Sequence, residues 1–236
     1  MVARTQRDSQ EEFSYADYLK WPQDERFEII DGISYAMNAP LRIHQEFLVE
    51  FTRQFANHFK NKTCKVYVAP FDVRLASRSK RDDEIFDVVQ PDISIICDPD
   101  KLDDKGCLGA PDLIIEILSP ATMSYDNVRK RALYEKTGVR EFWLVHPTDC
   151  LVMAYRLKDG LYGKPEIFDR ESGAQSAIFP DLKIDLIEVF GPTPEGYVVK
   201  EIPAEYFSKP ASKKNSSRAK DKKARTKTSN KKKREK

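Results

Sequence analysis

Apolar residues along the chain recur with two different periods. Between residues 41 and 59 they return every three or four positions, as Phe47, Phe51, Phe55 and Phe59 illustrate, which predicts a helix with one buried face. Shorter apolar runs bounded by turn residues predict strands at 65–75, 90–97, 111–119, 141–145 and 151–155. The chain is therefore expected to combine strands with helices.

Turn and cap residues mark the ends of further elements. Ser14 can cap a short helix that ends near Leu19, and residues 27–37 read as a hairpin that turns at Asp31-Gly32. A second helix is expected at 125–136, ending near Gly138. Residues 76–89 read as a charged loop.

The runs 90–97 and 111–119 are almost continuously apolar, as in strands covered on both faces, yet both contain acidic residues: Asp92 in the first, Asp112 and Glu116 in the second. If residues 98–110 close a symmetric hairpin, its centre is residue 104, and Asp92 then lies opposite Glu116. Opposed side chains have Cβ atoms about 5 Å apart, where two negative charges repel. A divalent metal between them would remove that repulsion.

Glu116 shares its strand face with Ile114 and Leu118, so its carboxylate must be paired, protonated or metal-bound. The alternative is a strand-end glutamate that reaches water or a lysine. Asp112 competes with Asp92 for the second acidic position. It lies four residues from Glu116 on one strand, about 13 Å away, and is interpreted as a strand-entry residue.

Lys130 follows Glu116 by fourteen residues, on the helix after that strand. It could return over the strand end and hold the attacking water or a phosphate. An exposed ion pair with Asp126 explains the same spacing equally well. Three other basic residues compete for the role: Arg129, Arg131 and Lys136.

The 236 residues are 40% apolar and 33% charged, enough for one domain with a substantial core and an extension. No apolar run is long enough for a membrane helix and the start of the chain lacks the apolar segment of a signal peptide, so a cytoplasmic protein is expected. The cysteines form no Cys-x-x-Cys pair, and reduced thiols are expected for all four: Cys64, Cys97, Cys107 and Cys150.

Charge is distributed unevenly between the two ends of the chain. Residues 209–236 hold 14 Lys and Arg against 2 acidic residues, a net charge of +12, while the rest carries −10. This tail has no large apolar residue, so residues 209–236 are expected to be disordered, as are residues 1–13. Nucleic acid is its favoured partner, and a solubilising role is the alternative. The candidate contacts are Lys213, Lys214, Lys222, Lys223, Lys231, Lys232, Lys233 and Arg234.

Several segments, in this order, resemble the Uma-type family of restriction-endonuclease-like proteins, within the PD-(D/E)XK nuclease-like superfamily. The resemblance spans about residues 14–190 and leaves the basic tail outside. It is carried by residues 27–32, Ala39-Pro40, His44, 90–94, 109–120, Asp126, Lys130, Tyr134 and 138–145.

The resemblance implies an α/β fold in residues 14–208, with a mixed sheet flanked by helices. It implies that Asp92 and Glu116 bind the metal, together with the main-chain carbonyl of Ile117. The superfamily motif has lysine two residues after the acid, where this chain has Leu118. In related nucleases that lysine lies on the following helix, which nominates Lys130.

The resemblance further implies that Glu28 is an additional acid near the metal and leaves a homodimer open. His44 and Gln90 could line the site, although a lone histidine at a helix start is more often structural. His58 and His146 show no metal-ligand spacing.

The expected function is metal-dependent hydrolysis of phosphodiesters, with DNA as the favoured substrate. Carboxylate, carbonyl and water ligands suit Mg²⁺, with Mn²⁺ as a substitute. Two alternatives remain: a nucleic-acid-binding module on a decayed nuclease fold, and a protein-interaction scaffold.

Overall fold

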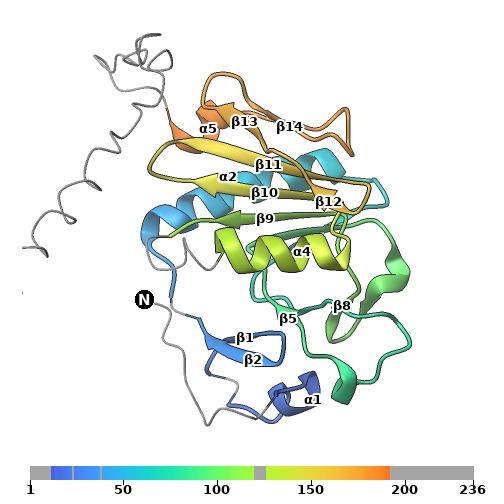
Figure 1. The fold of residues 1–236 in the computed structure, drawn as a ribbon. Coiled ribbons are helices and arrows are strands. Elements are labelled where there is room, and N and C mark those ends of the chain that lie inside the picture. Colours follow the sequence, from blue (N-terminus) through green and yellow to red (C-terminus); the bar gives the residue numbers. More distant parts are fainter. Residues whose placement is uncertain (1–11, 23, 38, 120–125, 192–236) are drawn as a thin grey trace, which may run out of the picture. The chain divides into compact units, whose positions relative to one another are not determined.

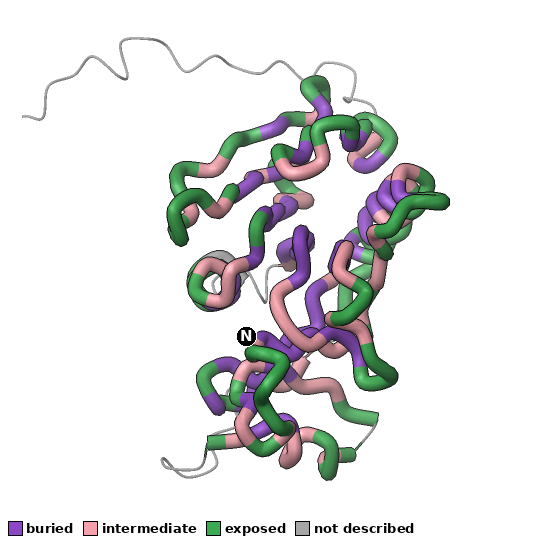
Figure 2. The backbone as a smooth tube through the Cα atoms, turned by 90° about the vertical axis from the view of Figure 1, so that its right-hand side faces the viewer, coloured by how far each residue is buried: buried purple, intermediate pink, exposed green. Residues whose placement is uncertain are grey.

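The long sheet of the molecule is built around its most apolar strands. The computed structural model describes residues 12–22, 24–37, 39–119 and 126–191. In it, β6 (Ile93–Ile96) and β9 (Leu113–Ile117) are buried at every position, and β10 (Glu141–His146) is buried at all but its last. Figure 1 shows β9 and β10 in the middle of the α/β architecture, and Figure 2 shows buried stretches of the backbone in the interior.

This seven-stranded sheet has the order β12-β11-β10-β9-β6-β3, with β13 also paired to β11. Strands β9 and β10 are parallel and the other pairs are antiparallel, so the sheet is mixed, as predicted. The remaining strands are β3 (Lys65–Val68), β11 (Leu151–Lys158), β12 (Leu161–Tyr162) and β13 (Glu166–Asp169).

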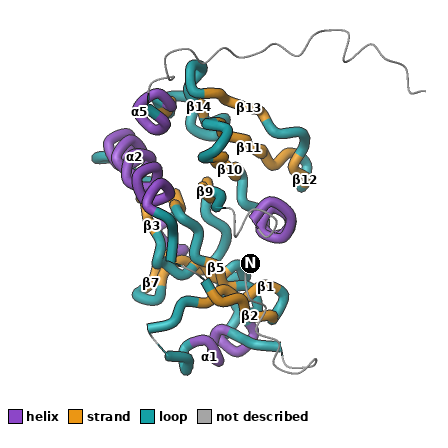
Figure 3. The backbone as a smooth tube through the Cα atoms, turned by 90° about the vertical axis from the view of Figure 1, so that its left-hand side faces the viewer, coloured by secondary structure: helices purple, strands orange, loops and turns teal. Residues whose placement is uncertain are grey.

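Helices cover both faces of this sheet, which explains why its strands lack polar alternation. The phenylalanine stripe of α2 (Arg42–Phe59) packs on the face formed by residues such as Ile115 and Trp143. Leu133 and Tyr134 of α4 (Arg131–Thr137) pack on the opposite face, with Ile114 and Phe142. Figure 3 shows the helices on the two sides.

A second sheet, of six strands, has the order β2-β1-β5-β4-β8-β7. Its strands β1 and β2 form the predicted hairpin about Asp31-Gly32, where both residues have positive φ. The bounds are β1 (Phe27–Ile30), β2 (Ile33–Ala36), β4 (Val73–Arg74), β5 (Val88–Val89), β7 (Leu102–Asp103) and β8 (Gly106–Leu108).

The shorter elements fill the connections. They are α1 (Tyr15–Tyr18), capped by Ser14 as predicted, η1 (Asp82–Glu84), η2 (Pro99–Lys101), the π-helical η3 (Asp126–Lys130), β14 (Ala174–Gln175), β15 (Lys183–Ile184) and α5 (Leu186–Phe190). Gly138 ends α4 with φ 87°, which confirms the predicted helix end. No helix within the described ranges has the length and apolarity needed to cross a membrane.

Two sequence predictions about connections are wrong in detail. The single strand predicted at 65–75 is two strands, β3 and β4, which belong to different sheets. Pro70 lies between them, and its missing N–H interrupts strand pairing. The loop predicted at 76–89 contains η1 and β5. Pairing with strands elsewhere in the chain decides β3, β4 and β5. Contacts within residues 81–84 hold η1.

The predicted register of the central hairpin is confirmed. Ile93 pairs with Ile115 and Ile95 with Leu113. One step further in this register, Asp92 lies opposite Glu116. The connection between the strands is more than a loop, because its strand β8 joins the second sheet through β4.

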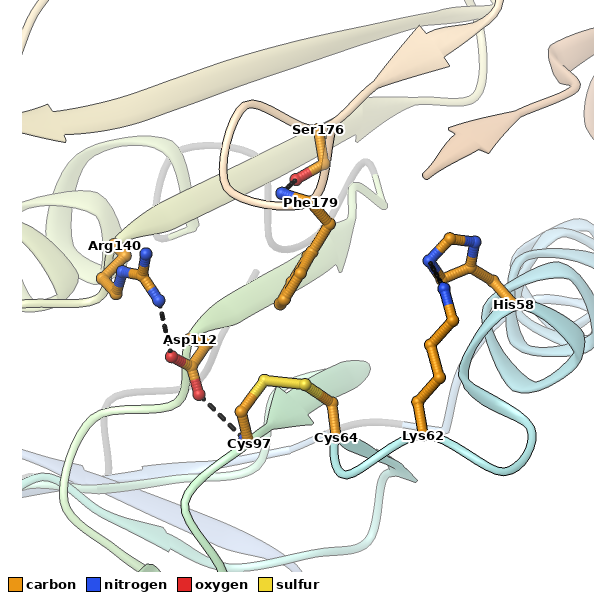
Figure 4. The surroundings of a disulfide bond; sticks show 8 residues. All are labelled: His58, Lys62, Cys64, Cys97, Asp112, Arg140, Ser176 and Phe179. Carbon is orange, nitrogen blue, oxygen red and sulfur yellow. Dashed lines mark hydrogen bonds and ion pairs between the residues drawn. A yellow bond between two sulfur atoms is a disulfide. The ribbon is translucent and has the colours of Figure 1, made fainter. Parts of the chain in front are cut away.

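The expectation of four reduced thiols is wrong for one pair, since Cys64 and Cys97 form a disulfide (Figure 4). Cys64 precedes β3 and Cys97 follows β6, at the next step beyond the Lys65–Ile96 pair of these antiparallel strands. The pairing of β3 with β6 therefore brings the two sulfurs together. Cys107 and Cys150 are free thiols, as predicted.

Candidate active site

Glu116 stands in the middle of the long sheet with 3% of its surface exposed. The Nζ of Lys130 lies 3.0 Å from its Oε1, and the hydroxyl of Tyr134 donates a 2.6 Å hydrogen bond to the same oxygen. A buried carboxylate requires such partners, because losing hydration is otherwise very costly. Glu116 is therefore paired, as the sequence required.

Glu28 brings a second carboxylate to the same lysine from strand β1 of the other sheet. The Nζ of Lys130 lies 2.9 Å from Glu28 Oε1, and the backbone N–H of Gln90 donates a 2.8 Å hydrogen bond to that oxygen. The Lys130 side chain is 4% exposed. Lys130 is therefore buried, and not on the exposed face that the alternative interpretation required. The Asp126 side chain of that alternative lies outside the described residues.

Tyr134 ties the helix to the same carboxylate. Burial raises the pKa of its phenol well above 10, and the nearby charge of Glu116 raises it further. The phenol therefore remains a hydrogen-bond donor at neutral pH.

Asp92 is bound in a different way, at the strand end opposite Glu116. Its Oδ2 accepts a 2.7 Å hydrogen bond from the backbone N–H of Ile117 and lies 3.1 Å from Nε2 of His44. The Asp92 side chain is 17% exposed, so it is more accessible to solvent than Glu116. His44, the third residue of α2, is thereby an immediate neighbour of an expected metal ligand.

Gln90 contributes its backbone N–H to the site, while its side chain makes hydrogen bonds outside the site. Its Oε1 accepts from the Arg26 guanidinium, and its Nε2 donates to Tyr18 and Asp72. Gln90 also lines a cavity of about 590 Å³ on that side.

Other candidates from the sequence lie apart from this cluster. Asp112 accepts from the Cys97 N–H and pairs with Arg140, in keeping with a strand-entry role. The competing basic residues have different partners: Arg129 contacts Tyr35, Arg131 lies over the Tyr155 ring and Lys136 pairs with Asp31. The candidate nucleic-acid contacts of the tail, from Lys213 to Arg234, lie outside the described residues.

The oxygen donors fit Mg²⁺ by their chemistry. Mg²⁺ typically takes one or two carboxylates and completes its shell with water. Asp92 and Glu116, opposed in register, offer such a pair. Among the described residues, no three His, Cys, Asp or Glu side chains are arranged to hold a metal. An ion here would therefore depend on the two carboxylates, a main-chain carbonyl and water.

Tyr134 contacts Glu116, but the sequence analysis assigned no role to this tyrosine. The signal was its spacing, since Tyr134 follows Lys130 by four residues and the two share a helix face. The link from Lys130 to Glu28 carried no local signal, because 102 residues separate them.

Comparison with known proteins places this cluster in a family context. A protein of Synechocystis sp. (strain ATCC 27184 / PCC 6803 / Kazusa), named "Uncharacterized protein slr1290", is 26% identical over 162 residues, which cover 67% of this chain and 82% of that protein. A crystal structure from Anabaena variabilis ATCC 29413, titled "a putative nuclease belonging to DUF820", has the same fold. Its TM-score is 0.61 at 20% identity, covering 75% of this chain and 97% of that one.

The family match covers most of the described residues. The Uma2 profile, described as "Putative restriction endonuclease", matches residues 15–187 and so includes both sheets and the acidic cluster. The chain belongs to the Uma2 family, within the restriction-endonuclease-like fold.

Proposed function

We propose that this protein is a metal-dependent endonuclease that hydrolyses phosphodiesters, with DNA as its favoured substrate. The observation that carries the proposal is the buried ammonium group of Lys130 between Glu28 and Glu116, beside the strand end that holds Asp92. Family membership supports the nuclease class.

Each side chain has a distinct proposed task. Asp92 and Glu116 bind Mg²⁺ with the Ile117 carbonyl, and Glu28 keeps Lys130 in place. Lys130 offsets negative charge that develops on the phosphate in the transition state. A bound Mg²⁺ would polarise a phosphoryl oxygen and lower the pKa of a bound water.

The burial of the charges argues against a decayed binding module. Holding two carboxylates and an ammonium group away from water is costly unless their geometry is well matched. A module that used only its surface and tail to bind nucleic acid would gain no affinity from this arrangement.

The direct test is nicking of supercoiled plasmid with Mg²⁺ or Mn²⁺. Asp92→Asn and Glu116→Gln should each abolish nicking. Asp112→Asn is the matched control, because it removes a carboxylate from the same region of the sheet but outside the cluster. Activity that persists in the Asp92 variant would indicate a contaminant, and inactive wild type with either metal would leave the binding module as the better account.

A metal titration of thermal stability separates metal binding from cleavage. A ligand that binds the folded state raises the melting temperature by mass action. Mg²⁺ should therefore raise the melting temperature of the wild type more than that of Asp92→Asn. Equal responses would remove Asp92 from the metal site.

A further inference from the structure

A small cavity of about 140 Å³ opens beside the acidic cluster, where strands β9 and β10 end and α2 begins. Its wall includes His44, Leu118, Ser119, His146 and Asp149. His44 joins the cavity to the cluster, because its Nε2 lies 3.1 Å from the Asp92 carboxylate. Whatever occupies the cavity therefore lies close to an expected metal ligand.

His146 reaches this wall through the register of the parallel strands. Leu144 pairs with Glu116 and Val145 with Ile117, so the next step places His146 beside Leu118. By strand alternation His146 faces the same side as Glu116, about 7 Å further along the strand. His146 thus lies beside Leu118, the aliphatic residue that follows Glu116 by two positions.

The imidazole of His146 has unused hydrogen-bonding capacity. Its Nε2 is buried and has no hydrogen-bond partner within the described residues, and its Nδ1 lies 3.9 Å from Asp149. Leaving a buried polar atom unpaired costs free energy, so such an atom commonly marks a ligand or a functional role. Nothing in the cluster of Glu28, Glu116 and Lys130 requires this histidine.

The size of the cavity limits its occupant. Pockets for drug-sized ligands begin near ~300 Å³. A phosphate group fits this limit, whereas a base with its sugar does not.

We propose that His146 binds a phosphate of the nucleic-acid strand, next to the phosphate held at the carboxylates, by donating a hydrogen bond from Nε2–H. The identity of the substrate rests on the proposed function. The cavity, with His44 and Asp149 also on its wall, then fixes the register of the strand over the metal.

Affinity for a short fluorescent DNA duplex in Ca²⁺ tests the proposal. His146→Ala should weaken binding by on the order of tenfold, the usual loss for a hydrogen bond to a charged group. His146→Gln should retain most of the affinity, because its side-chain amide N–H replaces Nε2–H, whereas His146→Asn mimics only Nδ1 and should bind like the alanine variant. His58→Ala is the control, since His58 pairs with Lys62 and Asp181 instead.

NMR of the three histidine rings in the full chain gives an independent readout. Adding the duplex should shift the His146 resonances and leave those of His58 in place. Inorganic phosphate at equal concentration should cause a smaller shift, because a free ion lacks the neighbouring contacts of the strand. An equal shift with phosphate alone would show a general anion site and overturn the nucleic-acid assignment.

The outcomes distinguish this proposal from the proposed function. If the wild type nicks DNA and Asp92→Asn does not, while His146→Ala binds normally and its resonances never shift, only the His146 proposal fails. If no metal supports nicking but the His146 resonances shift and Gln rescues affinity, the phosphate site stands and the nuclease proposal fails.

Discussion

Lys130 and Glu116 form an ion pair of 3.0 Å, although the residues lie on a helix and on the strand it covers, fourteen positions apart. Glu28 joins from a different sheet at 2.9 Å. One ammonium group thus faces two buried carboxylates, and its removal would leave both without their shared cation.

Lys130→Met should therefore lower the free energy of unfolding as well as activity. Breaking a buried ion pair by removing one partner typically costs about 3–5 kcal/mol. Lys136→Met is the matched control on the adjoining helix α4, because Lys136 pairs with Asp31 in solvent, where such pairs contribute about 0–1 kcal/mol. Urea unfolding compares the two, and equal losses would contradict a central role for the Lys130 pair.

Tyr134→Phe should change how stability depends on alkaline pH. The pKa of Tyr134 is raised in the fold, so its contribution is complete below the unfolded value near 10 and is lost as pH rises above 10. Without this hydroxyl, the fall in unfolding free energy above pH 10 should be shallower by about 1.4 kcal/mol per pH unit.

Denaturation monitored from pH 7 to 11 measures this slope. The buried Cys107 thiol, whose pKa is raised to about 12, also loses stabilisation with rising pH, but equally in both proteins. Parallel curves above pH 10 would show that the Tyr134 hydroxyl titrates normally.

Replacing the disulfide tests the connection between β3 and β6. Cys64→Ser with Cys97→Ser removes a link across 33 residues, for which chain-entropy estimates give about 4 kcal/mol of stability. Thiol titration of the denatured, unreduced wild type should count two groups, Cys107 and Cys150. Four titrating thiols, or no loss of stability in the double variant, would argue against the bond.

Removing residues 209–236 should weaken nucleic-acid binding to a similar extent for every sequence. Phosphate contacts made by lysine and arginine carry no base information, and they release counterions. The truncated protein should therefore also show a flatter dependence of affinity on salt. An unchanged slope of log affinity against log salt would assign the tail another role.

The sequence predicted the elements whose signals are local or symmetric. The α2 stripe, the Asp31-Gly32 turn and the Asp92–Glu116 register all follow from periodicity and spacing within short segments. Lys130 was undecided from spacing alone, since the same interval suits an exposed ion pair. The family resemblance favours the role in the site, which stays a prediction, and the structure shows that the lysine is buried and not exposed.

Contacts between distant segments could not be predicted in the same way. The division of residues 65–75 between two sheets depends on partners far away in the sequence, and so does the Cys64–Cys97 pair. The unused nitrogen of His146 becomes visible only when the packing around it is known.

The position of Lys130 between Glu28 and Glu116 also joins the two sheets, because each acid belongs to a different one. A single side chain thus has a role in the proposed chemistry and also stabilises the contact between the two sheets. Loss of this lysine would therefore weaken the contact between the two sheets as well as the proposed activity.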